Sequence, residues 1–157
     1  MHPASLDLLT RYYHALESKD PEGMAACYHK DAIFMDPVFG RLRRDEAAAM
    51  WKMLLGRAGD LKVSYQILHA DQASGSGHWI ARYTFSKTGR KVVNSIDSQF
   101  GFLEGQIMAH RDRFDLWRWS RQALGLKGLL LGWTPWVQKR IRAQAREGLD
   151  AFMGRKA

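Results

Sequence analysis

Two aspartates, Asp97 and Asp112, have the residue type and the sequence context for acid–base chemistry. Each lies in a segment in which apolar and polar residues alternate, and such alternation is typical of half-buried β-strands. The two segments are separated by Glu104-Gly105, a pair that predicts a two-residue hairpin turn. Residues 91–103 and 106–117 are therefore predicted to form an antiparallel hairpin that carries one carboxylate on each strand.

The register of this hairpin decides whether the two carboxylates meet. Counting outward from a turn at Glu104-Gly105 pairs Asp97 with Asp112, and directly opposed residues share a face of the sheet. Gln99 and His110 form the neighbouring pair on that face. Like charges held together must be solvated, paired with cations or partly protonated, and acid–base sites are commonly built in this way. A solvated surface pair is the alternative, and a slip of one residue would separate the two carboxylates.

A second hairpin is expected just upstream. A two-residue turn at Thr88-Gly89 would place Arg82 diagonally within reach of Asp97. A guanidinium there would lower the pKa of one carboxyl while the pKa of its neighbour rises. The alternative is that Arg82 neutralises a structural acid and has no part in chemistry.

Composition limits the class of protein. The chain has 157 residues, of which 46% are hydrophobic and 25% charged, as expected for one soluble globular domain. A single cysteine, Cys27, excludes an internal disulfide and favours a reducing compartment. The sequence shows no secretory leader pattern and no apolar run of membrane-spanning length, so a cytoplasmic location is expected.

The net charge of +8 is unevenly distributed. Residues 118–157 contain nine Lys or Arg and two acidic residues, a local balance of +7 that leaves +1 for residues 1–117. Because the body of the protein has no basic stripe, a nucleic-acid partner is not expected. The histidines have no metal-ligand spacing, so no metal site is expected either.

The elements that must position the aspartates follow from periodicity. Apolar residues recur at three- and four-residue steps in three N-terminal helices, at residues 5–18, 21–28 and 47–55. Besides the two strands of the hairpin, period-two segments predict strands at residues 32–35, 61–70 and 78–86, with a loop at 36–40 and a flexible turn at 74–77. Helices followed by a four-strand antiparallel meander indicate an α+β fold, with helices on one face of a curved sheet.

The chain changes character after Trp117. Four of the six tryptophans fall between residues 117 and 136, and a basic amphipathic helix is predicted after Pro135. Packing against the domain or a dimer contact is the favoured interpretation of residues 118–157, because polar and acidic residues are interspersed along that helix. Contact with a membrane surface is the alternative.

Residues 5–117 resemble the nuclear transport factor 2-like superfamily, which includes ketosteroid isomerases, limonene epoxide hydrolases and SnoaL-like polyketide cyclases. The segment LLTRYYHALESKDPEGMAACYHKDAIFMDPVFG looks like the opening helices, first strand and loop of that family, and EGQIMAHRDRFDLW looks like its closing strand. The resemblance implies a cone-shaped α+β domain over residues 1–117, a helical C-terminal extension over 118–157, a small hydrophobic ligand and a homodimer.

Two patterns within the family imply different roles. Similarity to ketosteroid isomerases implies Asp36 as the general base, Tyr12 as an oxyanion-hole tyrosine and Asp97 as a protonated acid that donates to the oxyanion. Similarity to epoxide hydrolases implies instead that Asp112, in the motif RDRFD, activates water with the help of Arg82. The positions of three other epoxide hydrolase residues do not match, since they hold Phe34, Asp36 and Thr84. A SnoaL-like cyclase needs only one acid in an apolar pocket.

The leading hypothesis is a cofactor-independent isomerase or cyclase that moves a proton on a small hydrophobic carbonyl compound. The predicted catalytic residues are Tyr12, Asp36, Asp97 and Asp112. The predicted substrate-binding residues comprise three polar residues that orient the substrate and four aromatic walls: Arg82, Gln99, His110, Phe34, Trp51, Trp79 and Phe114. The alternatives are an epoxide hydrolase-like enzyme, a non-catalytic ligand-binding protein or dimeric scaffold, and a platform that docks to a membrane surface through residues 118–157.

Overall fold

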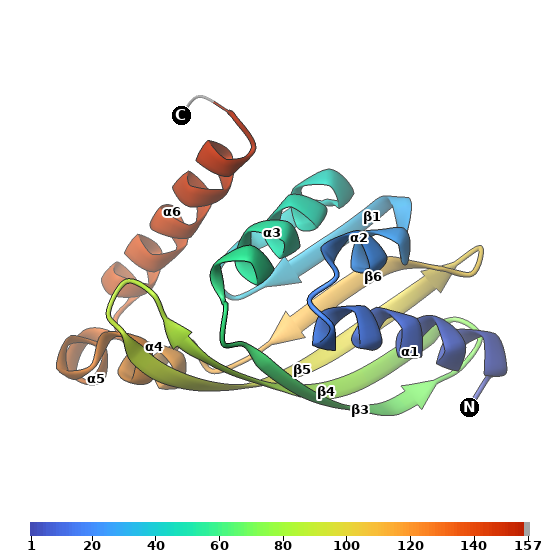
Figure 1. Cartoon of the computed structure of the whole chain (residues 1–157), viewed down its shortest axis with the longest axis horizontal. Helices are drawn as coiled ribbons and strands as arrows, with labels where there is room; N and C mark the ends of the chain where they lie inside the picture. Colours follow the sequence, from blue (N-terminus) through green and yellow to red (C-terminus); the bar gives the residue numbers. More distant parts are fainter. Residues whose placement is uncertain (156–157) are drawn as a thin grey trace.

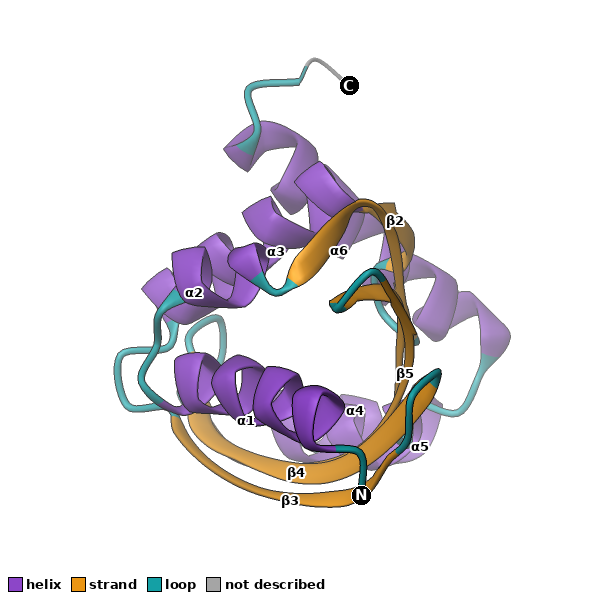
Figure 2. Ribbon diagram, turned by 90° about the vertical axis from the view of Figure 1, so that its right-hand side faces the viewer, coloured by secondary structure: helices purple, strands orange, loops and turns teal. Residues whose placement is uncertain are grey.

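A computed structural model describes residues 1–155 (Figure 1). The helices are α1 (Pro3–Glu17), α2 (Pro21–Ala26), α3 (Arg44–Arg57), α4 (Leu116–Leu124), α5 (Leu126–Leu131) and α6 (Pro135–Phe152). The strands are β1 (Tyr28–Asp36), β2 (Gly40–Arg43), β3 (Lys62–Ala70), β4 (Ser74–Phe85), β5 (Arg90–Leu103) and β6 (Gln106–Arg113). One six-stranded sheet in the order β2-β1-β6-β5-β4-β3 curves around the N-terminal helices (Figure 2), which confirms the predicted cone-shaped α+β class.

The N-terminal helices form because apolar residues repeat along one side of each. Leu8, Leu9, Tyr12 and Leu16 of α1 are at most 2% exposed, and they pack onto the concave face of the sheet. Helix α2 starts at a capping aspartate, whose side chain accepts a hydrogen bond from the backbone three residues on. The concave face is therefore closed by helices on one side, and the inward side chains of the strands complete the core.

The register of the β5–β6 hairpin differs from the prediction. Glu104-Gly105 does form the turn, with positive φ at both residues, but a bulge follows at Met108 on β6, opposite Gly101 and Phe102 of β5. The extra residue shifts the pairing by one, so Ser98 opposes Asp112 and Asp97 opposes Arg113. The predicted pairing of Asp97 with Asp112 is wrong, because the shift leaves these two carboxylates on opposite faces of the sheet.

The β4–β5 turn is also longer than predicted. Phe85 pairs with Arg90, so four residues connect the strands, and Arg82 opposes Val93. Arg82 is exposed on the outer face, and its guanidinium lies 3.5 Å from the hydroxyl of Ser64 on β3. The predicted position of Arg82 beside an aspartate of the site is therefore wrong.

Two parts of the sheet lie outside the predicted meander. Strand β1 pairs parallel with β6, and the loop after Asp36 returns as the short edge strand β2. Residues 74–77, predicted as a flexible turn, are the start of β4. Glycine serves close packing there: a Cβ atom on Gly75 would lie 2.8 Å from both Leu9 and Phe102.

The C-terminal extension forms three helices, and the two longer ones are anchored to the cone. Helix α4 packs against β5, where the side chain of Gln122 bonds both the N–H and the C=O of Val93. Helix α6, predicted as a basic amphipathic helix, packs on α3 through the fully buried Leu149. Among residues 1–155, no helix is both long enough and apolar enough to cross a bilayer.

Candidate active site

A chain of hydrogen bonds between side chains runs through the interior of the cone. Trp79 Nε1 donates to Ser98 Oγ at 3.1 Å, and Ser98 Oγ donates to Asp112 Oδ1 at 2.5 Å. His110 Nε2 lies 2.7 Å from the same carboxylate oxygen, and its Nδ1 lies 2.8 Å from the hydroxyl of Tyr28. Strands β4, β5, β6 and β1 each contribute one or two of these residues, so the whole inner face of the sheet positions the network.

The donors and acceptors of this network can all be matched. Asp112 Oδ1 accepts from Ser98 and faces His110 Nε2, while His110 Nδ1 faces the hydroxyl of Tyr28. The oxygen of Tyr28 also accepts from Trp51 Nε1 at 3.2 Å, and it lies 3.4 Å from the hydroxyl of Tyr12. Every polar group in the network has a partner, and its acceptor end is the buried carboxylate of Asp112.

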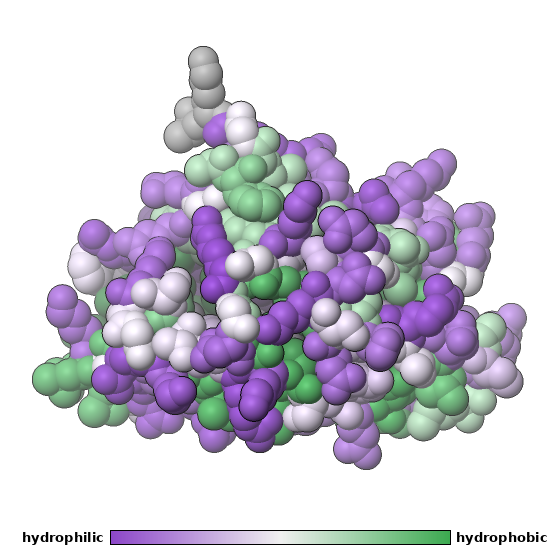
Figure 3. Space-filling model, in the orientation of Figure 1, coloured by the Kyte–Doolittle hydropathy of each residue, from purple (hydrophilic) through white to green (hydrophobic). Residues whose placement is uncertain are grey.

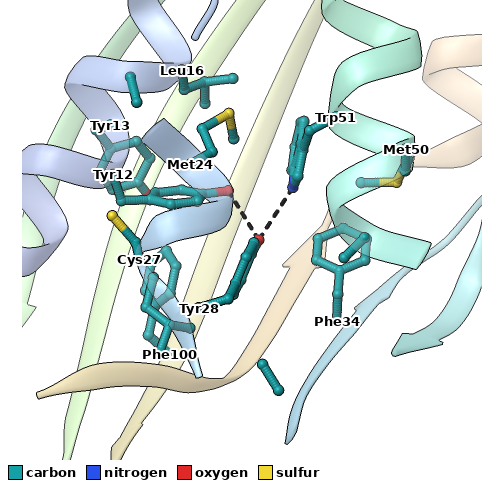
Figure 4. Close-up of a cluster of buried hydrophobic side chains, with 14 of the residues drawn as sticks. Tyr12, Tyr13, Leu16, Met24, Cys27, Tyr28, Phe34, Met50, Trp51 and Phe100 are labelled. Atoms are coloured by element: carbon teal, nitrogen blue, oxygen red, sulfur yellow. Dashed lines mark hydrogen bonds between the residues drawn. The ribbon is translucent and has the colours of Figure 1, made fainter. Parts of the chain in front are cut away.

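The two tyrosines of the network hold their protons. Burial raises the pKa of Tyr12, and the neighbouring Tyr28 and Asp112 raise it further. Burial also raises the pKa of Tyr28, although hydrogen bonds from Tyr12 and Trp51 oppose the shift. Figure 4 shows how the hydroxyl of Tyr28 points at both Tyr12 and Trp51 inside the aromatic cluster. Both phenols are therefore hydrogen-bond donors over the physiological pH range.

Asp36 lies at the end of β1, where the strand turns toward β2. Its Oδ1 accepts hydrogen bonds from the backbone N–H groups of Val38 and Phe39 at 2.9 and 2.6 Å. Within residues 1–155, its Oδ2 makes no hydrogen bond. Burial, opposed by the bond from Phe39 and assisted by the charge of Asp112, raises the pKa of Asp36 to about 6. The half-buried carboxyl is thus anchored through one oxygen and titrates near neutrality.

The sheet register brings Asp36 next to Asp112. Phe34 pairs with His110 and Met35 with Arg111 in the parallel β1–β6 ladder. The next residues along these two strands are Asp36 and Asp112, and the charge of Asp112 acts on the Asp36 carboxyl. The two inward carboxylates of the cone are therefore Asp36 and Asp112.

The deep interior around the network is filled by aromatic side chains. His110 stacks on Phe100 with ring centroids 4.5 Å apart and meets Phe34 edge-on at 5.0 Å. Trp51 and Trp79 approach to 6.2 Å, and both are at most 7% exposed. The hydroxyl of Tyr13 is also enclosed, and within the described residues it has no hydrogen-bond partner. This part of the cone is a packed core with a polar network inside it.

The cone is less completely covered along β3. The inward-facing residues of this edge strand, Val63, Tyr65 and Ile67, are only partly buried, as are Tyr83 on β4 and Phe114 after β6. Two hollows, of about 360 and 320 Å³, lie elsewhere: the first is bordered by Tyr28, His29, Lys30, Arg44, Glu104 and Gln106, and the second by Asn94, Ser95, Asp97, Arg113, Phe114, Asp115 and Arg118. These partly buried apolar residues border the packed core, and neither hollow lies inside the cone.

The structure brings together most of the residues selected from the sequence. Six line the interior as buried side chains and two more are half-buried at its margin; the six are Tyr12, Phe34, Trp51, Trp79, His110 and Asp112, and the two are Asp36 and Phe114. Three lie on the outer face instead, namely Arg82, Asp97 and Gln99. Asp97 is 74% exposed there and pairs with His78 at 2.7 Å, so it has no contact with the interior.

Two members of the network, Tyr28 and Ser98, were absent from the predicted site. Ser98 carried a visible signal, because it stands between Ile96 and Phe100 at period two and so is a polar residue in an apolar stripe. Tyr28 was assigned to the second helix, and its inward position depends on the β1–β6 pairing, which local pattern does not reveal. Among residues 1–155, no group of three or more His, Cys, Asp or Glu could hold a metal ion.

Solved structures with the same fold are similar to this chain over most of its length. A protein with a ketosteroid isomerase-like fold from Catenulispora acidiphila DSM 44928, solved with trimethylamine, has a TM-score of 0.67 and 13% identity, covering 82% of this chain and 97% of its own. An epoxide hydrolase of the limonene epoxide hydrolase-like type from M. tuberculosis has a TM-score of 0.59 and 21% identity, with coverages of 86% and 96%. A candidate polyketide cyclase from Xanthomonas campestris pv. campestris has a TM-score of 0.62 and 18% identity, with coverages of 77% and 97%.

At these identities the likeness is one of fold. No curated protein sequence matches the chain. The sequence model of the SnoaL-like domain family, however, matches residues 9–110, which include α1 from Leu9 onward, the β1 strand with Asp36 and the β6 strand as far as His110. The chain therefore belongs to the SnoaL-like domain family.

Proposed function

We propose that the protein binds a small hydrophobic carbonyl compound in its cone and transfers a proton on it, as an isomerase or a cyclase does. The proposal combines family membership with two inward carboxylates in an aromatic interior. Proteins of this fold include a candidate polyketide cyclase and a candidate isomerase. Because a fold hosts many functions, the argument depends on the site.

The observation that carries the proposal is the state of Asp36. Its Oδ1 is held by two backbone N–H groups while its Oδ2 makes no bond within the described residues, and burial raises its pKa to about 6. A base with a pKa close to the working pH combines a large ionised fraction with a real affinity for the proton. Asp36 is accordingly the proposed general base, and Oδ2 is the oxygen that receives the proton.

Asp112 acts on this base through its charge. Ser98 and His110 both donate to Asp112 Oδ1, and this fixes the carboxylate behind Asp36. A neighbouring negative charge favours the protonated form of Asp36, so Asp112 and His110 are proposed as positioning residues. Tyr12 is proposed to donate to the oxyanion that forms on the substrate, because its 3.4 Å bond to Tyr28 is the longest in the network.

Proton exchange at carbon tests this proposal without knowledge of the full reaction. Hydrophobic ketones, enones and β-dicarbonyl compounds are incubated with the protein in D₂O, and deuterium at the carbon next to the carbonyl is followed by NMR. We expect exchange with at least one class, slowed about 10²–10⁴-fold in Asp36→Asn. Asp97→Asn is the matched control, since Asp97 lies on the outer face, and it should exchange at the wild-type rate. Exchange no faster than in buffer for every compound would overturn the proposal.

Ligand binding without turnover is the second candidate. It is favoured by the hydrogen-bond network, because its polar side chains already have partners within the protein. The same compounds separate the two candidates when tryptophan fluorescence is recorded beside the exchange. Saturable quenching with no exchange would identify a binding protein whose polar network is structural.

Epoxide hydrolysis receives less support from the geometry. The arginine that the resemblance assigned to that reaction corresponds to Arg82, which is exposed on the outer face of the sheet. Asp112 is 4% exposed and already accepts two hydrogen bonds on one oxygen. The site therefore fits proton abstraction by Asp36 better than activation of water by Asp112.

A further inference from the structure

The C-terminal extension presents an apolar surface that no described residue covers. Six large apolar side chains in a stretch of eleven residues are 46–69% exposed: Leu126, Leu129, Leu130, Leu131, Trp133 and Trp136. We call these six residues the α5 surface. Of the two interpretations favoured from the sequence, packing against the domain holds for α4 and α6 and fails for this stretch, and the dimer contact stays a prediction.

The tryptophans and leucines of this surface lie together at one end of the molecule. Trp133 Nε1 donates to the carbonyl of Leu130 at 3.0 Å, and Trp117 Nε1 donates to the carbonyl of Leu129 at 3.2 Å. Both indoles therefore contact α5. Hydrophobic atoms gather at the lower left of the space-filling view (Figure 3), where α5 lies in Figure 1. Contiguous exposed apolar surface of this kind usually marks an interaction site.

The charge around the α5 surface has one sign. Residues 116–146 contain seven Lys or Arg and no Asp or Glu. The guanidinium of Arg121 lies 4.6 Å from the centre of the Trp117 ring, and that of Arg140 lies 5.9 Å from the centre of the Trp136 ring. Among residues 1–155, neither of these arginines nor Lys127 forms an ion pair with an acid. The α5 surface thus has neighbouring positive charges, on Arg121, Lys127 and Arg140, that can pair with an anionic partner.

We propose that the α5 surface docks the protein onto an anionic lipid bilayer. Trp and Leu beside Lys and Arg, on a short helix that lies along the surface, match the composition of segments that insert into the headgroup region. A second copy of this chain is the less suitable occupant, because a symmetric contact through the same surface would bring two clusters of like charge together. Anionic headgroups supply the opposite charge, and the acyl boundary accepts the leucines and indoles.

Vesicle co-sedimentation with the full chain tests the proposal. We expect retention on phosphatidylcholine vesicles that contain phosphatidylglycerol and little retention on phosphatidylcholine alone. Retention should fall strongly at about 1 M NaCl, where the Debye length is about 3 Å. Quenching of tryptophan fluorescence by brominated lipid reports whether the indoles enter the bilayer.

Two pairs of variants separate the apolar from the electrostatic contribution. Leu130→Gln/Trp133→Gln should weaken binding at least tenfold, because each side chain loses burial in the lipid. The control Leu68→Gln/Leu103→Gln changes two leucines that are exposed elsewhere on the protein, 52% and 46%, and should bind like wild type. Lys127→Gln/Arg140→Gln should weaken binding about fivefold for each charge removed, and the exposed pair Lys30→Gln/Lys62→Gln is its control.

The outcomes are distinct. Absence of wild-type binding to anionic vesicles overturns the proposal, and so does equal binding to both kinds of vesicle. Dimerisation lost in Leu130→Gln/Trp133→Gln, with vesicle binding intact, would show that a second copy covers the surface. Circular dichroism and urea unfolding verify that each variant folds. If the Leu130→Gln/Trp133→Gln variant does not fold, the charge variants and the salt series still test the proposal.

Discussion

His110 Nε2 lies 2.7 Å from Asp112 Oδ1 in the interior of the cone, where the two side chains are 1% and 4% exposed. The outer face holds a second pair with the same 2.7 Å separation, His78 and Asp97, which are 35% and 74% exposed. The two pairs have the same chemistry and differ in their contact with water. Together they are a matched test of what burial does to a histidine–aspartate pair.

Loss of Asp112 is predicted to destabilise the protein far more than loss of Asp97. Asp112→Ala leaves His110 Nε2 and the Ser98 hydroxyl buried without an acceptor, at a cost of about 3–5 kcal/mol. Asp97→Ala removes a partner that water replaces, at a cost of at most about 1 kcal/mol. Urea unfolding at neutral pH measures both, and similar losses in the two variants would show that the interior pair is not isolated from solvent.

Asp36 is predicted to make stability fall as pH rises. Burial raises its folded-state pKa to about 6 from an ordinary value of 3.8, so between these values the native state binds a proton that the unfolded state has lost. The contribution is fully present below pH 3.8 and is lost as the pH passes 6, a change of about 1–3 kcal/mol. Unfolding of wild type and Asp36→Asn across this range should show the decline only in wild type. Parallel curves would contradict the raised pKa.

The same group should set the pH dependence of proton exchange. A base must be ionised to accept a proton, so exchange should rise with an apparent pKa of about 6. In Asp112→Asn the neighbouring charge is removed, and the apparent pKa should shift downward. A profile that does not move between these proteins would exclude Asp112 as the group that tunes the base.

Of the two tyrosines in the network, Tyr28 is predicted to contribute more to the free energy of unfolding. Tyr28→Phe leaves Trp51 Nε1 and His110 Nδ1 without their partners, and we expect a loss of about 1–3 kcal/mol. Tyr12→Phe removes a single bond of 3.4 Å and should cost less, about 0.5–1 kcal/mol. Urea unfolding of the two variants measures these losses in stability. An equal or larger loss of stability in Tyr12→Phe would contradict the predicted ranking.

Glu46 is predicted to fasten the C-terminal helix to the cone in a pH-dependent way. Its carboxylate meets Arg146 at 2.6 Å and Arg155 at 2.9 Å, and its other oxygen accepts from the backbone of Arg43. Burial would raise its pKa, but these bonds outweigh burial and leave the pKa below 4.5. The stabilisation is therefore present above pH 4.5 and is lost as the pH falls through the lowered value.

The measurement for Glu46 is amide hydrogen exchange in α6. Glu46→Gln should speed exchange there at neutral pH while α1 stays protected. Asp7→Asn, which alters an exposed pair with Arg11 on α1, is the control and should leave α6 unchanged. Unaltered protection of α6 in Glu46→Gln would show that the apolar contact of Leu149 holds the helix without these ion pairs.

Local pattern predicted the elements of the cone well and its long-range pairings poorly. The three N-terminal helices and the Glu104-Gly105 turn were predicted because capping residues, periodicity and turn chemistry act within a few residues. The bulge near Gly101 and the parallel pairing of β1 with β6 depend on contacts between distant segments. Because of this bulge, Ser98 and not Asp97 lies on the inner face. The inward carboxylates are therefore Asp36 and Asp112 and not Asp97 and Asp112.

The types of the site residues were therefore easier to predict than their partners. Tyr12, His110, Trp51 and Trp79 are among the residues predicted for the site, and they are buried. Nothing in the spacing of Tyr28 and His110, which are 82 positions apart, shows that they meet at 2.8 Å. Likewise, the leucines and tryptophans of the α5 surface have the composition of a packed segment, and only the arrangement of α5 shows that they are exposed.

The C-terminal extension also contacts the loop that carries the proposed base. Arg142 Nε on α6 donates a 2.9 Å hydrogen bond to the carbonyl of Pro37, the residue that follows Asp36. A protein shortened to residues 1–117 would keep every acid and every aromatic of the cone yet lose this hydrogen bond. The Asp36 carboxylate would then be oriented by its own turn alone, so the proposed active site extends to α6.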